Sequence, residues 1–470
     1  MLFNSFDFIL IFLPITLWVY FSLHRLRLHT AAKAALVAAS LYFYAYFNWS
    51  YLPVILSSIA INYLVAWRMS TDAPKWRRKL WLAVGISFNL GIIGYFKYFD
   101  FFIENINALF NADFALQHIL LPLGLSFFTF QQIAFVVDSY HRKTALPKFL
   151  DYCNFVTFFP QLIAGPIVLP EEMLPQFEDK TKHCVNYENL FNGLFLFTLG
   201  LGKKVLIADS IAVFANTGFD MMNAYTMAEA WLTSLSYSLQ LYFDFSGYCD
   251  MAIGIGLMFN IKLPQNFNSP YRAHNFQDFW HRWHMTLNRF FTQYLYLPLG
   301  GSKRGEARTL GNIFIVFLMS GIWHGAGWTF IVWGILHGVS VILNRLWKKA
   351  GHPLPNWISI PLTLFFINIF WVFFRADSLT DAMLIVTSMF DNTNLSLTMN
   401  YKTQLATMID PKLVMIILLV SFPLAFLGKT AYQWMEQKDL YRWKSAATII
   451  LFVIECLFIS RVVSFLYFNF

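Results

Sequence analysis

The sequence has little charge. Asp, Glu, Lys and Arg together make up 13% of its 470 residues, whereas hydrophobic residues make up 57% and Phe alone contributes 52. Ordinary soluble domains carry about 25% charged residues. Several apolar runs approach or reach the roughly 20 residues that cross the hydrocarbon core of a bilayer as a helix. The composition therefore excludes a soluble globular domain and predicts an all-α, polytopic membrane protein in contact with the lipid bilayer.

Cysteine is also scarce. The four cysteines, Cys153, Cys184, Cys249 and Cys456, are scattered along the chain and include no Cys-x-x-Cys pair. This spacing indicates neither a disulfide framework nor a thiolate zinc site.

The chain has no single basic stripe, although its formal net charge is +8. Its Lys and Arg residues lie in short loops between apolar runs, which argues against a nucleic-acid partner and follows the positive-inside rule. The loops expected in the cytoplasm are residues 25–33, 68–79, 142–148, 345–349 and 438–444. The N-terminus is then expected outside.

The apolar runs predict about 11 to 14 transmembrane or re-entrant helices. Residues 8–23 lack the basic segment and cleavage site of a signal peptide, so they are expected to stay as the first span. No repeat or long linker divides the chain. We therefore expect one domain over residues 1–470, with packing helices in 1–115, a motif-bearing core in 116–345 and further helices in 346–470.

Polar residues interrupt three of the apolar runs. Residues 121–132 contain Ser, Thr and two Gln, and residues 158–167 are broken by two prolines. Proline removes a helical donor and bends or ends the helix. Ser236, Gln240 and Asp244 recur at four-residue spacing and therefore share one helical face. Polar groups at membrane depth indicate that these segments border an interior cavity.

His324 lies in the apolar stretch formed by residues 317–331. An ionisable side chain at membrane depth is costly, so a functional role is the first hypothesis. Residues 279–287 hold two further histidines, His281 and His284. Together these histidines predict a reaction centre inside the bilayer.

Arg282 and Arg289 lie beside these histidines, close to Trp280 and Trp283. Cationic groups embedded among aromatic rings could bind an anionic cofactor. The segment is too polar for a straight span and too aromatic for an ordinary loop, so we expect it to dip into the cytoplasmic side of the membrane.

The strings that carry these features resemble the membrane-bound O-acyltransferase (MBOAT) family. The matching strings are PLGLSFFTFQ at 122–131, FPQLIAGP at 159–166, YSLQLYFDFSGYCDMAIGIG at 237–256, NSPYR at 268–272, FWHRWH at 279–284 and GIWHG at 321–325. Within the family the chain is most similar to the bacterial alginate O-acetyltransferase branch.

The resemblance implies an enzyme built as a helical bundle around a central tunnel. His324 matches the family's essential histidine, and His284 falls on a second polar position, while His281 and His337 are weaker candidates. The family's implied reaction is O-acetylation of an exported polysaccharide such as alginate. The donor would be a cytoplasmic thioester, acetyl-CoA in the first place. An extracytoplasmic acetyltransferase partner and a multi-pass position in the bacterial inner membrane are also implied.

Acyl transfer from a thioester to a hydroxyl needs a base and a group that stabilises the developing oxyanion. We expect His324 to be the base and His284 to hydrogen-bond the carbonyl or to orient His324. Arg282, Arg289 and His281 are the expected contacts of the donor.

Several alternatives stay open. His281 and His284, with His324 or His274, could bind zinc or haem iron. The chain could instead transfer D-alanine to teichoic acid from a carrier-protein thioester. A non-enzymatic lipid or sugar transporter is a third possibility, although the internal repeat typical of transporters is not evident.

Four charged residues have two readings each. Asp244 and Asp250 are either proton-handling groups or carboxylates held by nearby hydrogen-bond donors. Lys203 and Lys204 are expected to anchor a helix at the membrane interface, with contact to donor phosphates as the minority reading.

Overall fold

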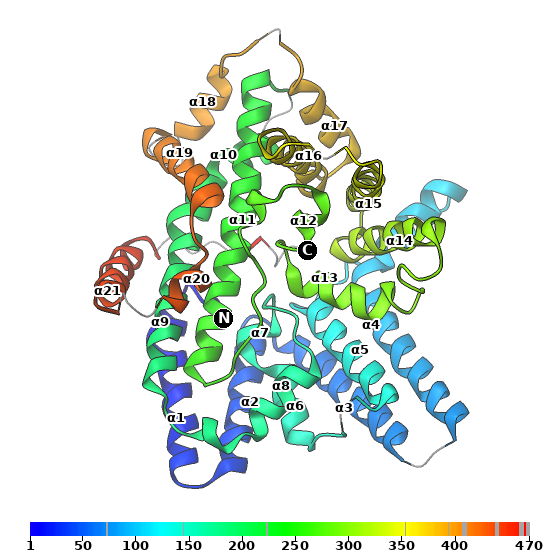
Figure 1. Ribbon diagram of the computed structural model, residues 1–470, viewed down its shortest axis with the longest axis vertical. Helices are drawn as coiled ribbons and strands as arrows, with labels where there is room; N and C mark the ends of the chain where they lie inside the picture. The colour runs from blue at the N-terminus through cyan, green and yellow to red at the C-terminus, as the bar shows by residue number, and fades with distance from the viewer. Residues whose placement is uncertain are drawn as a thin grey trace.

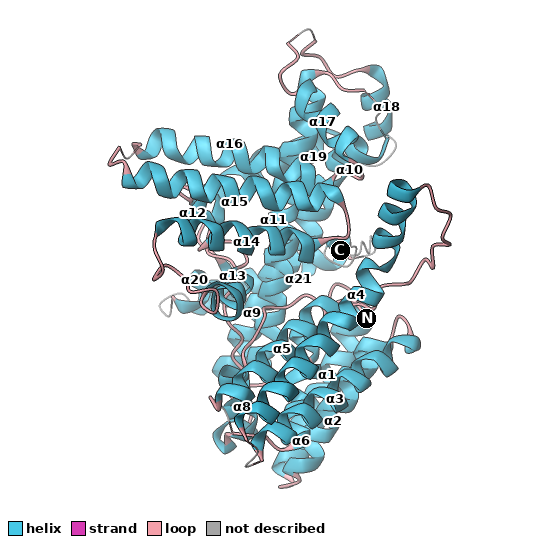
Figure 2. Ribbon diagram, turned by 90° about the vertical axis from the view of Figure 1, so that its right-hand side faces the viewer, coloured by secondary structure: helices cyan, strands magenta, loops and turns pink. Residues whose placement is uncertain are grey.

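The computed structural model describes residues 1–71, 74–143, 145–221, 224–352, 354–392, 394–406, 411–437, 441–459 and 465–466. In this part of the chain every regular element is a helix. Figures 1 and 2 show the helices from two directions, with α1, α2, α3, α6 and α8 at one end of the molecule and α17 and α18 at the other. The all-α prediction is confirmed.

The first four helices form a layer on one side of the molecule (Figure 2). They are α1 (Leu13–Arg25), α2 (His29–Ala45), α3 (Leu52–Ser70) and α4 (Lys75–Phe110). Proline stands in the first turn of α1 and of α3, where its missing N–H is not needed for a helical hydrogen bond. α1 packs against α2, and α3 packs against α4.

The central part of the chain carries the helices that surround the predicted site. They are α5 (Leu125–His141), α6 (Phe149–Thr157), α7 (Phe159–Leu162), α8 (Pro170–Glu178), α9 (Tyr187–Gly202), α10 (Asp209–Met221), α11 (Met227–Met258), α12 (Phe276–Trp280), α13 (Met285–Phe291), α14 (Glu306–His324) and α15 (Trp328–Lys349). The last helices are α16 (Asn356–Arg375), α17 (Leu379–Ser388), α18 (Met399–Ala406), α19 (Pro411–Leu427), α20 (Ala431–Glu436) and α21 (Tyr441–Phe458).

The long helix α11 passes through the middle of the molecule and is buried along most of its length (Figure 1). It packs against α9 through glycines: a Cβ on Gly200 would lie 2.5 Å from the carbonyl oxygen of Gly247, and one on Gly193 would lie 2.5 Å from that of Gly254. Close backbone approach through small residues is the usual way in which membrane helices pack. The helical face that carries Ser236, Gln240 and Asp244 is buried, as predicted.

The predicted breaks in the helices are present. The helical path ends at Phe158, resumes for one turn in α7 and then continues as a loop to α8. Residues 266–301 likewise form only short helices, among them α12 and α13, which are joined by a turn at residues 281–284. These broken segments bring non-helical backbone and polar side chains into the buried centre of the molecule.

Helices α14 and α15 form a tight antiparallel pair, with α16 alongside α15 (Figure 2). A Cβ on Gly334 would lie 2.6 Å from the carbonyl oxygen of Phe317, so the two backbones are in contact. At the other end of the pair, Arg345 Nε lies 2.8 Å from Glu306 Oε1. Hydrogen bonding from Arg345 lowers the pKa of the Glu306 carboxyl.

Six segments in the described part of the chain are long and apolar enough to cross a membrane: Asp7–Arg25, Trp49–Ser70, Lys75–Phe110, Tyr187–Met221, Trp328–Lys349 and Asn356–Arg375. The protein is therefore a multi-pass membrane protein. The 11 to 14 transmembrane or re-entrant helices expected from the sequence also include short and polar segments, which the six long apolar helices do not. Helices such as α5 and α11 belong to that group, since one is short and the other carries buried carboxylates.

Candidate active site

His324 is the last residue of α14 and is 3% exposed. Its imidazole ring is surrounded by aromatic rings in edge-to-face contact: the ring centroids lie 4.7 Å from Trp323, 5.0 Å from Trp333 and 5.1 Å from Phe374. These rings come from α14, α15 and α16, so the contact between the three helices defines the position of the imidazole.

The end of α14 is held by two residues of α4. The ammonium group of Lys97 donates hydrogen bonds to the carbonyl oxygens of Trp323 (2.6 Å) and His324 (2.9 Å). The hydroxyl of Tyr98 donates to the carbonyl oxygen of Ile322. The last carbonyls of a helix have no partner within the helix and carry partial negative charge, so a cation there satisfies both requirements.

His284 directly precedes α13 as its N-cap residue, has a left-handed backbone conformation with φ of 45°, and is 1% exposed. Its Nδ1 lies 3.1 Å from Asn266 Oδ1. The same oxygen accepts hydrogen bonds from the backbone N–H and the hydroxyl of Thr286. Because an amide oxygen only accepts, His284 Nδ1 carries the proton, and in the neutral ring Nε2 carries the lone pair.

Trp323 lies against both histidines. Its ring centroid is 4.7 Å from that of His324 and 6.4 Å from that of His284. The structure therefore brings together the two predicted catalytic residues, which are separated by forty positions in the sequence.

A cavity of about 670 Å³ lies beside the C-terminal end of α14. Its wall includes Lys97, the Gly325–Gly327 segment that directly follows His324, and Phe374, whose ring contacts His324. Asp209 and Arg375 also line the cavity, so it is polar as well as aromatic. A solute in this cavity would lie next to the segment that directly follows His324.

Arg282, Arg289 and His281 lie farther out. Arg282 Nε is 2.8 Å from Asp278 Oδ1, one helical turn earlier. Arg289 pairs with Glu172 of α8, with 2.9 Å between Nη2 and Oε2. His281 is exposed. Both guanidinium groups are thus already paired with a carboxylate, and their binding of a donor stays a prediction.

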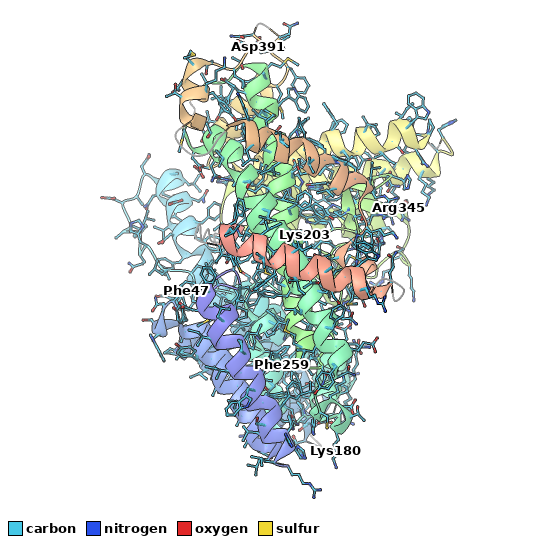
Figure 3. All side chains as sticks on the ribbon, turned by 90° about the vertical axis from the view of Figure 1, so that its left-hand side faces the viewer. Phe47, Lys180, Lys203, Phe259, Arg345 and Asp391 are labelled. Atoms are coloured by element: carbon cyan, nitrogen blue, oxygen red, sulfur yellow. The ribbon has the colours of Figure 1, made fainter. Side chains whose placement is uncertain are left out.

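The interface-anchor reading of Lys203 and Lys204 is wrong. Lys204 is 1% exposed, and its Nζ lies 2.6 Å from Asp244 Oδ1 and 2.8 Å from Asp209 Oδ1. Lys203 Nζ lies 2.5 Å from Asp250 Oδ2. Figure 3 labels Lys203 near the centre of the molecule. The two lysines are internal counter-ions of the carboxylates on α11, because a π-helical turn over Lys203–Ala208 points them at that helix.

His337 of α15 has a packing role. Its Nδ1 accepts a hydrogen bond of 3.2 Å from the indole N–H of Trp280, and its ring lies between Trp280, Trp333 and Phe370. This arrangement connects α12 to α15.

The rival metal centre is not assembled at these histidines. His281 is exposed, His284 is buried, and the ring of His274 lies 3.1 Å from the side-chain oxygen of Asn356. Among the described residues, the one group of potential ligands close enough to share an ion is formed by other histidines, discussed below.

Sequence reasoning missed Lys97 and Asn266. Lys97 interrupts the long apolar helix α4, and a cation at that depth was the signal that could have identified it. Asn266 carries no comparable signal, since its importance depends on its contact with His284, eighteen positions away.

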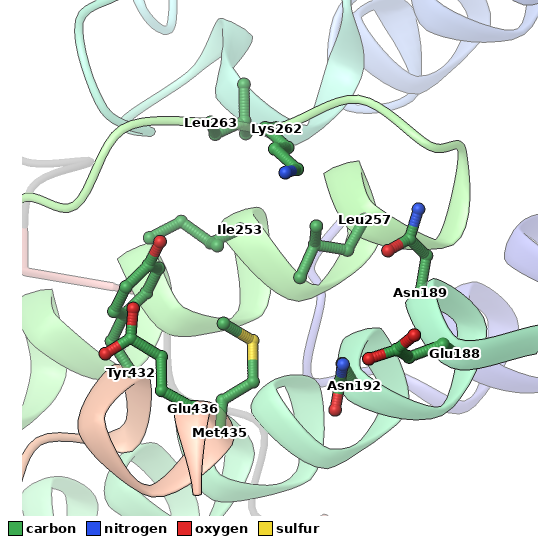
Figure 4. A pocket seen from close by; sticks show the side chains of 10 residues that line it. All are labelled: Glu188, Asn189, Asn192, Ile253, Leu257, Lys262, Leu263, Tyr432, Met435 and Glu436. Carbon is green, nitrogen blue, oxygen red and sulfur yellow. The ribbon is translucent and has the colours of Figure 1, made fainter. Parts of the chain in front are cut away.

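A second cavity, of about 400 Å³, lies between α9, α11 and α20 (Figure 4). Its lining includes Glu188, Glu436 and Lys262, and none of the predicted site residues. Two carboxylates against one ammonium group do not favour an anionic donor. We therefore place the candidate site at the cavity beside His324.

Comparison with known proteins shows the family of this chain. A family model described as "MBOAT, membrane-bound O-acyltransferase family" matches residues 125–378, more than half of the chain. The chain belongs to this family. The MBOAT match begins at α5 and ends just after α16, so it contains both His284 and His324. The protein is accordingly an MBOAT acyltransferase, which confirms the enzyme prediction over the transporter alternative.

Individual MBOAT relatives extend the match. A peptidoglycan O-acetyltransferase of Helicobacter pylori is 43% identical, over 100% of this chain and 98% of the relative. A probable alginate O-acetylase AlgI of Pseudomonas aeruginosa is 37% identical, over 83% of this chain and 75% of the relative. A teichoic acid D-alanyltransferase of Bacillus subtilis is 29% identical over 51% of this chain. The two relatives named for O-acetyl transfer therefore match far more of the chain than the one named for D-alanyl transfer.

Proposed function

We propose that this MBOAT protein moves an acetyl group from a cytoplasmic thioester, acetyl-CoA, to hydroxyl groups of a polysaccharide outside the cytoplasmic membrane. Peptidoglycan is the favoured acceptor. The relative named for it matches almost end to end, whereas the relatives named for alginate align over about three quarters of their length or slightly more. This choice replaces the emphasis on alginate that the family branch suggested.

One observation carries the proposal: two buried histidines that are both neighbours of Trp323, at the end of a helix that borders a polar cavity of about 670 Å³. A buried, uncharged imidazole is a suitable base for a hydroxyl proton. The surrounding aromatic rings exclude water, which protects a thioester from hydrolysis.

In the proposed first step, an imidazole nitrogen of His324 takes the proton from the hydroxyl group that will receive the acetyl group. The hydroxyl oxygen then forms a bond to the thioester carbonyl carbon, and the carbonyl becomes an oxyanion. When the oxyanion collapses, the C–S bond breaks, and the thiolate takes the proton from the imidazolium. The products are an acetyl ester and free thiol, and His324 returns to its starting state.

His284 supports this step as a lone-pair acceptor. Asn266 holds the proton on Nδ1, so Nε2 of the neutral ring cannot donate to an oxyanion. We therefore assign His284 to orienting His324 or the incoming hydroxyl. The alternative in which His284 donates to the carbonyl would need a protonated ring.

Arg282 and His281 are the proposed contacts of the donor phosphates, because both retain N–H groups near the surface. Arg289 would act through Glu172, by holding α8 against α13. An extracytoplasmic acetyltransferase partner is proposed to complete delivery to the polysaccharide, and the bacterial inner membrane is the proposed location.

The test measures O-acetyl ester on isolated peptidoglycan from cells that lack the chromosomal gene and carry a plasmid copy. His324→Ala and His284→Ala should abolish or strongly reduce ester, while His352→Ala, an exposed histidine outside the site, should not. Immunoblots of membranes keep protein levels equal. Normal ester in His324→Ala cells would overturn the catalytic assignment.

The acceptor is tested separately. Muropeptide analysis and analysis of secreted polysaccharide are made on the same cells, together with D-alanine ester measurement on teichoic acid where the cells make it. Loss of acetyl ester from a secreted polysaccharide alone would overturn peptidoglycan as acceptor but retain the reaction. Loss of D-alanine ester would overturn acetyl transfer.

A further inference from the structure

Three histidines meet at the end of the molecule opposite α17 and α18. His24 lies in the last turn of α1, His29 begins α2, and His183 ends the short helix Lys180–His183 that follows α8. Figure 3 shows Lys180, the first residue of that short helix, at this end. The site shares no residue with the cavity beside His324.

The three imidazole rings are in mutual contact. The ring centroids of His24 and His183 are 4.0 Å apart with nearly parallel planes, and those of His29 and His183 are 4.5 Å apart. Nδ1 of His24 lies 2.9 Å from Nδ1 of His29. Each ring can present one nitrogen so that all three nitrogens lie within 4.8 Å of one another.

The hydrogen bonding of His24 is incomplete. The residue is 4% exposed, and its Nε2 is buried with no hydrogen-bond partner in the part of the chain that the structure describes. Two Nδ1 atoms that face each other can share only one proton, whereas both can bind to the same cation.

We propose that His24, His29 and His183 bind one divalent transition-metal ion, Zn²⁺ in the first place, with water as a fourth ligand. Imidazole nitrogen is a preferred ligand of Zn²⁺, and three histidines with one open position are an established zinc-binding set. Zn–N bonds of about 2.0–2.1 Å in a tetrahedron place nitrogens about 3.3 Å apart. Binding requires the two Nδ1 atoms of His24 and His29, now 2.9 Å apart, to separate slightly, and the stacked ring of His183 to turn toward the ion.

The charges around the cluster are mixed, since Lys33 and Lys180 lie near His183 as cations and Asp179 as an anion. The Nζ of Lys33 lies 2.5 Å from Asp151 Oδ1. This ion pair offsets the charge of Lys33. Asp179, at the start of the short helix that carries His183, adds a carboxylate on the same side.

The metal would connect parts of the chain that are distant in sequence. The side-chain amide of Asn260, just after α11, donates hydrogen bonds to the carbonyl oxygens of Lys182 (3.0 Å) and Cys184 (2.7 Å), on both sides of His183. An ion on His183 would therefore tie the α1–α2 turn to the end of α11. Its role is structural and independent of the proposed acyl transfer.

The test uses the full-length protein, purified in detergent with an affinity tag that contains no histidine and stripped with a chelator. After equilibration with Zn²⁺ and removal of free ion, elemental analysis should find about one Zn²⁺ per chain. His24→Ala, His29→Ala and His183→Gln should each weaken binding by more than the roughly 10–100-fold that loss of an outer-shell group costs. His352→Ala, on the exposed surface, should bind normally.

Two further measurements test the metal site even if the His24→Ala protein does not fold. Co²⁺ on the wild-type protein should produce visible absorption bands of a tetrahedral site, and these should be absent from His183→Gln. Zn²⁺ should raise the unfolding temperature of the wild-type protein but not that of His183→Gln. Equal Zn²⁺ content in wild type and His183→Gln, or no retained Zn²⁺ in wild type, would overturn the site. Neither result bears on acyl transfer.

Discussion

The ammonium group of Lys97 lies 2.9 Å from the carbonyl oxygen of His324, although the two residues are 227 positions apart in the sequence. This contact joins the layer of N-terminal helices to the helix that ends at the candidate base. It makes the geometry of the site depend on α4, which lies outside the part of the chain that the MBOAT family model matches.

Lys97→Met should reduce acetyl transfer by about 10-fold or more. The substitution keeps the length of the side chain but leaves the carbonyl oxygens of Trp323 and His324 without their donor, which costs about 1–3 kcal/mol when a buried group is involved. Ester content of peptidoglycan, normalised to protein level, measures the effect. Lys75→Met, at the exposed start of α4, is the control. Equal activity of both variants would show that Lys97 does not support the site.

Asn266→Ala should lower kcat by about 10–100-fold with little change in KM, because His284 loses the acceptor that holds its proton on Nδ1. Asn266→Asp keeps an acceptor oxygen and should retain more activity. Kinetics of acetyl transfer by purified protein, recorded across a pH range, separate the two variants. A purely structural role of Asn266 predicts equal losses in both and an unchanged pH profile.

Lys204→Met should destabilise the protein by about 3–5 kcal/mol, because it leaves the carboxylates of Asp244 and Asp209 buried without their counter-ion. Thermal unfolding in detergent, followed by loss of monodisperse protein on a sizing column, measures the change. Lys303→Met, on the exposed surface, is the matched control and should unfold at the wild-type temperature. A small effect of Lys204→Met would mean that water or lipid reaches this cluster.

The two histidines of the site could be predicted from the sequence because each violates a simple rule. His324 is an ionisable residue in an apolar stretch, and His284 lies in a segment too polar to span a membrane. The prediction that Lys204 anchors a helix at the membrane interface was wrong. A lysine at the end of an apolar run is typical of an interfacial anchor, and only the folded chain shows that Asp244, forty positions later, faces it.

The helix breaks could also be predicted, since proline acts locally on its own helix. The packing of helix against helix could not. In the sequence, closely packed glycines such as Gly321 of α14 and Gly334 of α15 cannot be distinguished from Gly311 of α14, which has no neighbouring atom within 4 Å of an added Cβ. Which glycine permits close approach depends on how each helix is rotated in the bundle, and hydrophobic periodicity is weak when both lipid and protein interior are apolar.

Gly334→Ala should lower both stability and activity. Its Cβ would lie 2.6 Å from the carbonyl oxygen of Phe317, so α15 must move away from α14 at a cost of about 1–3 kcal/mol. Trp333, next in sequence, would then shift relative to His324. Gly311→Ala, on the same helix pair, meets no atom within 4 Å and should be neutral or slightly stabilising. Unfolding temperature and peptidoglycan ester content of both variants check the prediction, and a Gly334→Ala protein as stable and active as Gly311→Ala would contradict the close contact between α14 and α15.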